Sequence, residues 1–384
     1  MEAYLDNSAT TKAFESVKDI VVKTMMEDYG NPSSLHRKGV EAEHYVKKAA
    51  EAVAKTLKAA PSEIIFTSGG TESNNMAIIG AARANRRAGK HIITSTIEHA
   101  SVYNVFGYLE EEGYRVTYIP VDESGHLKLD QLEAAIDSGT TLVSVMYVNN
   151  EIGSVNPVGR IGEIIKKKNP RTLFHVDAIQ AYGKYRICPK RESIDLLSAS
   201  GHKIHGPKGV GFLYVKSGTK IVPVVFGGGQ QKGMRSGTHN VSGIAGMGEA
   251  AREIYENHEE KIRVMYELKK QFVELMEGLE GVSVNGLTGE DSAPHVVSVG
   301  FEGVKSEVLL HALEDRGIYA SSGSACSSNH PAVSGTLKGV GVRRELLDST
   351  LRFSFSVFTT KEEIQYCAQV LEELLPVLRR YRRM

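Results

Sequence analysis

The sequence predicts an α/β protein in which a larger region is built on a mostly parallel sheet of seven strands and a smaller region is α+β. Up to about residue 220, short apolar runs rich in β-branched residues alternate with longer stretches of helical period, which is the pattern of βαβ units. Beyond it, a long helical stretch is followed by short strands and helices. The 384 residues are 41% hydrophobic and 24% charged, a composition typical of ordinary folded proteins.

Seven apolar runs of strand length occur in the larger region. We expect strands at residues 63–67, 91–95, 115–120, 141–148, 172–177, 196–199 and 211–215. The stretches between them carry apolar residues at helical spacing and predict helices at residues 72–86, 100–112, 129–135 and 160–168. This alternation favours a mostly parallel sheet.

The smaller region follows a long helical pattern. Apolar residues recur at helical spacing from 241 to about 279, and the helix that they predict bends near Asn257. Further strands are expected at 295–301, 317–321 and 351–357, and further helices at 305–316 and 361–380. We therefore expect a large domain of residues 15–259 and a small domain that combines residues 1–14 with residues 260–384.

Charge and hydropathy exclude several classes of function. Lys plus Arg and Asp plus Glu both number 46, so the whole chain has no electrostatic bias toward nucleic acid or an anionic membrane. Apolar runs such as residues 145–148 fall far short of the roughly 20 residues that a bilayer-spanning helix needs. The N-terminus also lacks the pattern of a secretory signal. We expect a cytoplasmic protein without membrane contact and without direct contact to nucleic acid.

The three cysteines are too few and too widely spaced for a disulfide framework or a Cys-x-x-Cys metal site. Cys367 fits a helical core, and Cys188 gives no signal. Cys326 lies in a polar stretch, about residues 321–335, that we expect to be mobile and to expose the thiol. Cys326 is therefore the candidate for a reactive cysteine.

A strand, a glycine turn and the start of a helix follow one another at residues 64–74. Gly69, Gly70 and Thr71 stand where unpaired backbone N–H groups meet, which predicts an anion site. A well-capped helix after a tight turn is the alternative. The dinucleotide and P-loop fingerprints are absent, so the pattern disfavours a nucleotide but allows a single phosphate.

Two charged residues end apolar segments of the larger region. Asp177 ends the run 174–177, at the strand end where open α/β sheets bind ligands, although a helix N-cap would have the same signature. Lys203 stands among small and glycine residues, where desolvation would make its amine nucleophilic; a surface loop lysine is the alternative. His202 and His205 lack a carboxylate or cysteine at ligand spacing, so we expect no metal site.

In combination, the motifs resemble those of the pyridoxal-phosphate-dependent cysteine desulfurases, in the class V aminotransferase group of fold type I. The resemblance rests on Ser-x-His-Lys at 200–203, His-Val-Asp-Ala-x-Gln at 175–180, Arg-x-Gly-Thr-x-Asn at 235–240 and Ser-Gly-Ser-Ala-Cys at 322–326, and it runs from residues 4–11 to residues 351–354. The last motif is similar to that of the subgroup that serves nitrogenase and general iron–sulfur cluster assembly. Gly70 stands where many relatives carry alanine, a change that should not remove the phosphate site.

The resemblance implies a role for each residue around the cofactor, pyridoxal 5'-phosphate (PLP). Lys203 would carry PLP as a Schiff base and later move the Cα proton of the substrate. Asp177 would hold the pyridine nitrogen protonated, Gln180 would bond the ring hydroxyl, and His99 would stack on the ring and relay protons. The remaining cofactor contacts would come from Gly70, Thr71, Asn150, Ser200, His202 and, from a second subunit of a homodimer, Thr238.

The resemblance also implies the substrate and the reaction. Arg352 would clamp the carboxylate of L-cysteine, assisted by Asn150 and Asn7. Cys326 would take the substrate sulfur as a persulfide, release L-alanine and pass the sulfur to an iron–sulfur scaffold or another acceptor protein. No metal is required, although Cys326 would suit a transient iron–sulfur ligand.

Three alternatives stay open from the sequence. A selenocysteine lyase would use the same pocket, and a class V aminotransferase would not need Cys326. A non-catalytic sulfur or iron–sulfur carrier would leave Lys203 and Asp177 idle. Two further features have no derived role: His36, for which a structural loop role is at least as plausible, and the arginines of residues 379–383, which suit a solvated helix end or a docking patch for an acidic partner or tRNA.

Overall fold

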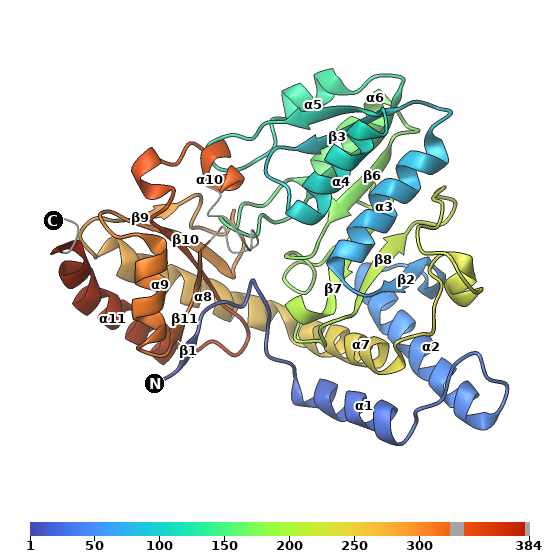
Figure 1. Cartoon of the computed structure of the whole chain (residues 1–384), viewed down its shortest axis with the longest axis horizontal. Helices are drawn as coiled ribbons and strands as arrows, with labels where there is room; N and C mark the ends of the chain where they lie inside the picture. The colour runs from blue at the N-terminus through green and yellow to red at the C-terminus, as the bar shows by residue number, and fades with distance from the viewer. Residues whose placement is uncertain (323–333, 381–384) are drawn as a thin grey trace.

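The computed structural model of the chain describes residues 1–322 and 334–380. Its largest sheet has seven strands in the order β2-β8-β7-β6-β5-β3-β4 (Figure 1). The strands are β2 (Ile64–Thr67), β3 (His91–Ser95), β4 (Arg115–Ile119), β5 (Thr140–Met146), β6 (Leu173–Asp177), β7 (Leu196–Ser200) and β8 (Gly211–Val215). Only β8 runs antiparallel to its neighbours, so the predicted mostly parallel sheet of seven strands is confirmed.

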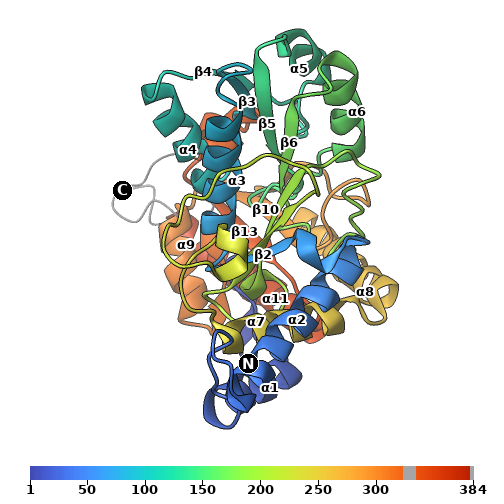
Figure 2. The ribbon, with the colours of Figure 1, turned by 90° about the vertical axis from the view of Figure 1, so that its right-hand side faces the viewer.

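Helices cover both faces of this sheet (Figure 2). One face packs against α3 (Gly70–Asn85) and α4 (Ala100–Glu111). The other packs against α1 (Glu15–Met26), α2 (Arg37–Leu57), α5 (Leu129–Ala135), α6 (Val158–Lys168) and α7 (Val241–Tyr255). Neighbouring strand residues belong to different cores, as Leu142 and Val143 do, because successive strand side chains point to opposite faces.

The predicted long helix is divided where its bend was expected. Helix α7 ends at Tyr255, and α8 (His258–Glu277) begins directly after a two-residue break at Glu256 and Asn257. Asn257 has a φ of 49°, in the left-handed region that asparagine adopts more readily than most residues. Together α7 and α8 connect the seven-stranded sheet to the rest of the chain (Figure 1).

The C-terminal part contains an antiparallel sheet in the order β12-β13-β10-β9, with β9 (Val282–Asn285), β10 (Val296–Phe301), β12 (Ser321–Ser322) and β13 (Thr350–Ser354). This sheet packs against α8, α9 (Ser306–Glu314) and α11 (Lys361–Arg380) around a separate apolar core. A short helix, α10 (Gly335–Gly339), precedes β13. The α+β prediction is confirmed here, whereas the exact division of the chain into two domains stays a prediction.

The N-terminal segment crosses from one part of the molecule to the other. Strand β1 (Ala3–Tyr4) pairs with β11 (Ile318–Tyr319) in parallel, and Asp6 forms a β-bridge with Ser354. A few residues later, the backbone N–H of Thr11 donates to the carbonyl of His202, at 3.0 Å. The intervening residues therefore lie between the two sheets.

Two features left open by the sequence have structural contacts. His36 caps the N-terminus of α2, where its Nδ1 accepts from the backbone N–H of Gly39 at 3.4 Å. Arg379 donates to the backbone carbonyls of Glu302 and Gly281. Residues 381–384, which include the last two arginines, lie outside the described part of the chain. Within that part, no helix has the length and apolarity that crossing a membrane requires.

Candidate active site

A cavity of about 370 Å³ lies where the carboxyl ends of β6 and β7 meet the first turn of α3 and the strand β12. Most of the predicted site residues line it, namely Gly70, Thr71, His99, Asn150, Asp177, Gln180, Ser200, His202, Lys203 and Arg352. A larger hollow, of about 900 Å³, lies between α2, β2 and the segment before α7, and none of the predicted site residues lines it. The fold therefore gathers these residues at one place.

The first turn of α3 lies at one end of the cavity and offers backbone N–H groups that suit an anion. Gly69 caps the helix with a φ of 152°, which a side chain would not tolerate well, and the first N–H groups of the helix follow it. Ser200, which is buried at the end of β7, and His202 face the same end. Burial and, to a smaller extent, the charge of Lys203 lower the pKa of His202 to about 4, so His202 is a neutral hydrogen-bond donor at neutral pH.

Asp177 is a buried acid, and both of its carboxylate oxygens accept hydrogen bonds. Oδ1 accepts from the backbone N–H of Ile179 at 3.0 Å, and Oδ2 accepts from Nδ2 of Asn74 at 2.8 Å. Burial raises the pKa of Asp177, against the lowering effects of these bonds and of the nearby His99 and Lys203. No helix begins at Asp177, so the alternative of a helix N-cap does not apply.

Lys203 lies in the short 3₁₀ helix η2 (Gly201–Lys203), directly after β7. Its Nζ donates to the backbone carbonyls of Ser8 and Ala9, the second at 2.8 Å. Behind it, the buried Lys184 donates from Nζ to the carbonyl of Lys203 at 2.5 Å, and burial lowers the pKa of Lys184 to about 7. The predicted nucleophilic lysine is therefore an inward-facing residue and not a surface loop lysine.

His99 caps α4 and faces the same cavity. Its Nδ1 accepts from the backbone N–H of Ser101 at 3.1 Å and lies 2.8 Å from Ser101 Oγ. Because the backbone N–H is a donor, Nδ1 carries no proton in the neutral ring, and Nε2 carries it instead.

Gln180 is oriented by two contacts. Its Nε2 donates to the carbonyl of Ser8 at 3.0 Å, and its Oε1 lies 3.2 Å from Nε2 of His295. Burial holds the pKa of His295 well below its ordinary range, so the ring is neutral and donates from Nε2. One N–H of the Gln180 amide remains for a ligand in the cavity.

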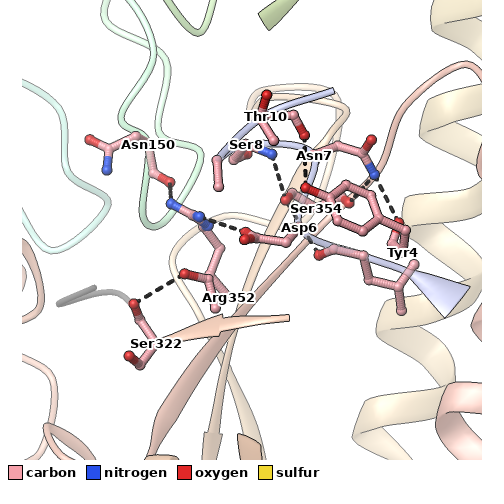
Figure 3. A network of polar contacts seen from close by, with 12 residues as sticks. Tyr4, Asp6, Asn7, Ser8, Thr10, Asn150, Ser322, Arg352 and Ser354 are labelled. Carbon is pink, nitrogen blue, oxygen red and sulfur yellow. Dashed lines mark hydrogen bonds and ion pairs between the residues drawn. The ribbon is translucent and has the colours of Figure 1, made fainter. Parts of the chain in front are cut away.

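Arg352, on β13, lines the cavity and contacts Asp6 and Asn150 (Figure 3). Its Nη2 pairs with Asp6 Oδ1 at 2.8 Å, and its Nη1 donates to the backbone carbonyl of Asn150 at 3.0 Å. Its Nε is buried and has no hydrogen-bond acceptor among the residues that the structure describes. The guanidinium lines the cavity, and each Nη group carries one N–H beyond those bonded to Asp6 and Asn150, so it has donors for a further carboxylate.

Two predicted site residues, Asn7 and Thr238, do not line the cavity, and a third, Cys326, is not described. The Asn7 amide donates to the backbone carbonyls of Tyr4 and Ser354, at 3.0 and 2.9 Å, and does not line the cavity; Asp6 takes that place. Thr238 is exposed and does not line the cavity of its own chain. Cys326 lies outside the described residues. The roles predicted for these three stay predictions.

The structure adds acidic residues that the sequence interpretation missed. Glu98 Oε1 accepts from Ser95 Oγ at 2.5 Å and from the backbone N–H of Met146 at 3.0 Å, and burial raises the pKa of Glu98 to about 8. Glu151 follows the candidate residue Asn150, and burial raises its pKa as well. Their positions next to His99 and Asn150 in the sequence were the only available signal.

The residues of the cavity fit PLP on three observations. The N-terminus of α3 offers N–H groups for a phosphate. The charged form of the buried Asp177 would be stabilised by a protonated ring nitrogen. The Arg352 guanidinium, which lines the cavity, suits an amino acid carboxylate. Within residues 1–322 and 334–380, no group of three or more His, Cys, Asp or Glu side chains is arranged to hold a metal ion.

Comparison with known proteins gives consistent matches over nearly the whole chain. The aminotransferase class-V family matches residues 3–367. A cysteine desulfurase IscS of Methanosarcina thermophila is 43% identical over 376 residues, which cover 98% of this chain and 92% of that protein. A solved NifS-like protein has a TM-score of 0.93 at 39% identity, with 98% of this chain and 100% of that chain covered. SspA, solved in complex with cysteine, has a TM-score of 0.77 at 34% identity, with 93% and 100% covered.

These matches agree with the cavity. They extend over both sheets, so they include the segments that carry Lys203, Asp177 and Arg352. The sequence identities, 43% and 39%, are well above the level at which two proteins share only a fold. The chain therefore belongs to the class V aminotransferase family, among its NifS-like and IscS-like cysteine desulfurases.

Proposed function

We propose that this protein is a PLP-dependent cysteine desulfurase that converts L-cysteine to L-alanine and keeps the sulfur as a persulfide on Cys326. The observation that carries the proposal is the convergence of Lys203, Asp177 and Arg352 on one cavity. Relatives with the name cysteine desulfurase, and the solved complex of SspA with cysteine, support the choice of substrate.

Each part of the cofactor has a group to hold it. Gly70, Thr71, Ser200 and His202 would bind the phosphate, since they surround the N-terminus of α3. Lys203 Nζ would hold the aldehyde carbon. Further contacts would come from Asp177 at the ring nitrogen, Gln180 at the ring hydroxyl, His99 at the ring face and Asn150 at the rim.

When bound, PLP supplies an electron sink for the pair that is released when the Cα–H bond of the substrate breaks. Arg352 would bind the substrate carboxylate and so fix the direction of that bond. Lys203 Nζ would accept the Cα proton, because its side chain lines the cavity. His99 Nε2 would hold or return a proton on the ring side.

The sulfur step uses the Cys326 thiolate. It would attack the sulfur of the substrate, so that an S–S bond forms while the C–S bond breaks. The carbon skeleton takes up a proton and leaves as alanine, and the two sulfurs remain on Cys326. A sulfur-acceptor protein, such as an iron–sulfur scaffold, would then remove the outer sulfur.

Two surface observations support a homodimer. Thr238 is exposed and away from the cavity of its own chain, as a residue that reaches a second subunit would be. Leu35 and Phe226 are 100% and 80% exposed, and large apolar side chains of this kind are commonly covered by a partner. Analytical ultracentrifugation should give a dimer. A cytoplasmic location stays part of the proposal.

The alternatives make different predictions. A selenocysteine lyase would turn over selenocysteine faster than cysteine. An aminotransferase would keep its activity when Cys326 is changed. A carrier protein without catalysis would bind no PLP and would lack a visible absorption band.

The test measures the visible absorption and the alanine released from L-cysteine. The wild-type protein should be yellow, should be bleached by borohydride and should release alanine. Cys326→Ser should keep the colour and lose the turnover, whereas Cys188→Ser, as the matched control, should keep both. A colourless protein, or a Cys326→Ser variant that still desulfurates cysteine at the normal rate, would contradict the proposal.

A further inference from the structure

Asn74 is a fully buried polar residue on α3 that joins two of the candidate catalytic groups. Its Nδ2 donates to Asp177 Oδ2 at 2.8 Å and to Ser101 Oγ at 2.9 Å, and Ser101 Oγ lies 2.8 Å from His99 Nδ1. We infer, resting on the proposed function, that Asn74 is a positioning residue that fixes the Asp177 carboxylate and the His99 imidazole for the cofactor ring.

The first branch of this network fixes the carboxylate. Asp177 Oδ1 is held by the backbone N–H of Ile179, and Asn74 holds Oδ2, so the plane of the carboxylate cannot turn. The remaining lone pairs are left for the cavity that Asp177 lines. Without Asn74, Oδ2 would lose this donor in a buried environment, where an unpaired acceptor is costly.

The second branch orients the imidazole. The Ser101 hydroxyl accepts from Asn74, so its own hydrogen is free to point at His99 Nδ1. The backbone N–H of Ser101 donates to the same nitrogen. Both contacts keep Nδ1 unprotonated, so His99 would exchange protons at Nε2.

An amide is the residue type that this position requires. It has two N–H groups and no charge, so it can serve an acid and a hydroxyl together without changing the charge of the site. Its Oδ1, in contrast, is buried and has no partner in the part of the chain that the structure describes. Packing alone would favour an apolar side chain of similar size, so the reason for asparagine lies in its two donated bonds.

Other charged groups face the same network and would remain in an Asn74 variant. The charges of His99 and Lys203 act on Asp177, and Asp177 in turn acts on Glu98. Glu151 faces His99 from the segment after β5. A change in the variant is therefore attributable to the lost hydrogen bonds and not to a lost charge.

The test compares Asn74→Leu and Ser101→Ala with the control Asn85→Ala in the PLP-loaded protein. Asn85 lies at the far end of the same helix, where its amide donates to two backbone carbonyls. Asn74→Leu should lower kcat for alanine release by about tenfold, the effect of one hydrogen bond to a charged group. Its KM for cysteine should be unchanged, its visible band should be altered, and PLP should be lost faster on dialysis.

Ser101→Ala separates the branches, because it should lower kcat while it leaves the visible band and the retention of PLP unchanged. If Asn74→Leu matches Asn85→Ala in kcat and visible band, the inference is wrong, although the proposed function stands as long as the wild-type protein desulfurates cysteine. If Asn74→Leu does not fold, Asn74→Ala replaces it. Failure of both to fold would make Asn74 a structural residue and overturn the inference.

Discussion

Arg352 Nη2 lies 2.8 Å from Asp6 Oδ1, an ion pair between residues that are 346 positions apart in the chain. The pair anchors the N-terminal segment to β13 and holds the guanidinium at the edge of the cavity (Figure 3). The backbone carbonyl of Asn150 accepts a second N–H from Arg352, so the guanidinium is held in place before any substrate binds. Such preorganisation reduces the entropy cost of binding a carboxylate.

The first prediction is that Arg352→Lys weakens the binding of cysteine. A lysine ammonium is a point charge. It cannot maintain the contacts with Asp6 and Asn150 and also bind a carboxylate through two parallel hydrogen bonds. We expect kcat/KM for cysteine to fall by about 10- to 100-fold, mainly through KM. Steady-state kinetics of alanine release would measure the change.

The exposed Arg343, which pairs with Glu302 and Glu345, provides the control. Arg343→Lys should leave KM unchanged. The visible absorption of Arg352→Lys should equal that of the wild type, because Arg352 is assigned to the substrate and not to the cofactor. A normal KM in Arg352→Lys would exclude it as the carboxylate clamp.

The second prediction concerns Gly70, the first residue of α3. A Cβ atom at Gly70 would lie 2.2 Å from Cδ1 and 2.8 Å from Cγ1 of Ile179. Gly70→Ala must therefore displace Ile179, which itself lines the cavity. We expect a stability loss of about 1–3 kcal/mol, typical of overpacking, and weaker retention of PLP.

Ile179→Ala removes Cδ1 and Cγ1, the two atoms that the new Cβ would contact. The double variant Gly70→Ala with Ile179→Ala should therefore retain PLP better than Gly70→Ala alone. Urea unfolding and dialysis of the loaded protein would measure the two effects. Equal retention in Gly70→Ala and the wild type would show that Ile179 moves aside without cost.

The sequence predicted those helices, strands and site residues that depend on a short stretch of neighbouring residues. The seven strands are short and, apart from β4, almost fully buried, and their predicted bounds agree with the structure to within about two residues. Asp177 was identified because it ends an apolar strand, and Lys203 because it stands among small and glycine residues. The break at Asn257 also had a local cause, since an asparagine interrupts the helical pattern.

The features that the sequence did not predict depend on tertiary contacts. In α1, Val22, Met25 and Met26 are exposed, so its apolar residues do not mark one buried face. Strand β9 is only partly buried along its length. The pairing of Asp6 with Arg352 joins the two ends of the chain, and no local pattern reports such a contact.

The third prediction is that alkylation acts at Cys326. Cys367 is fully buried in α11, and burial raises the pKa of its thiol far above the ordinary value, so it should not react. Treatment of the native protein with iodoacetamide should therefore abolish desulfuration and leave the PLP absorption intact. Peptide mass spectrometry would identify the modified residue, and modification of Cys367 at the same rate would contradict the assignment of the reactive thiol.

The fourth prediction follows from His175, which is fully buried on β6 between two serines. Its Nδ1 lies 2.7 Å from Ser144 Oγ and its Nε2 lies 2.9 Å from Ser198 Oγ. Burial lowers the pKa of His175 from 6.5 to about 3. Between these two values the unfolded chain binds one proton more than the folded chain, so the free energy of unfolding falls as the pH is lowered.

The expected slope from this one residue is at most about 1.4 kcal/mol per pH unit. His175→Asn keeps a polar partner for the serines but does not titrate, so its unfolding free energy should change less between pH 6.5 and 4.5 than that of the wild type. His311→Asn is the control, because the His311 side chain is 76% exposed. Urea unfolding at several pH values would measure the slopes, and parallel slopes for the wild type and His175→Asn would mean that His175 accepts a proton in the folded state.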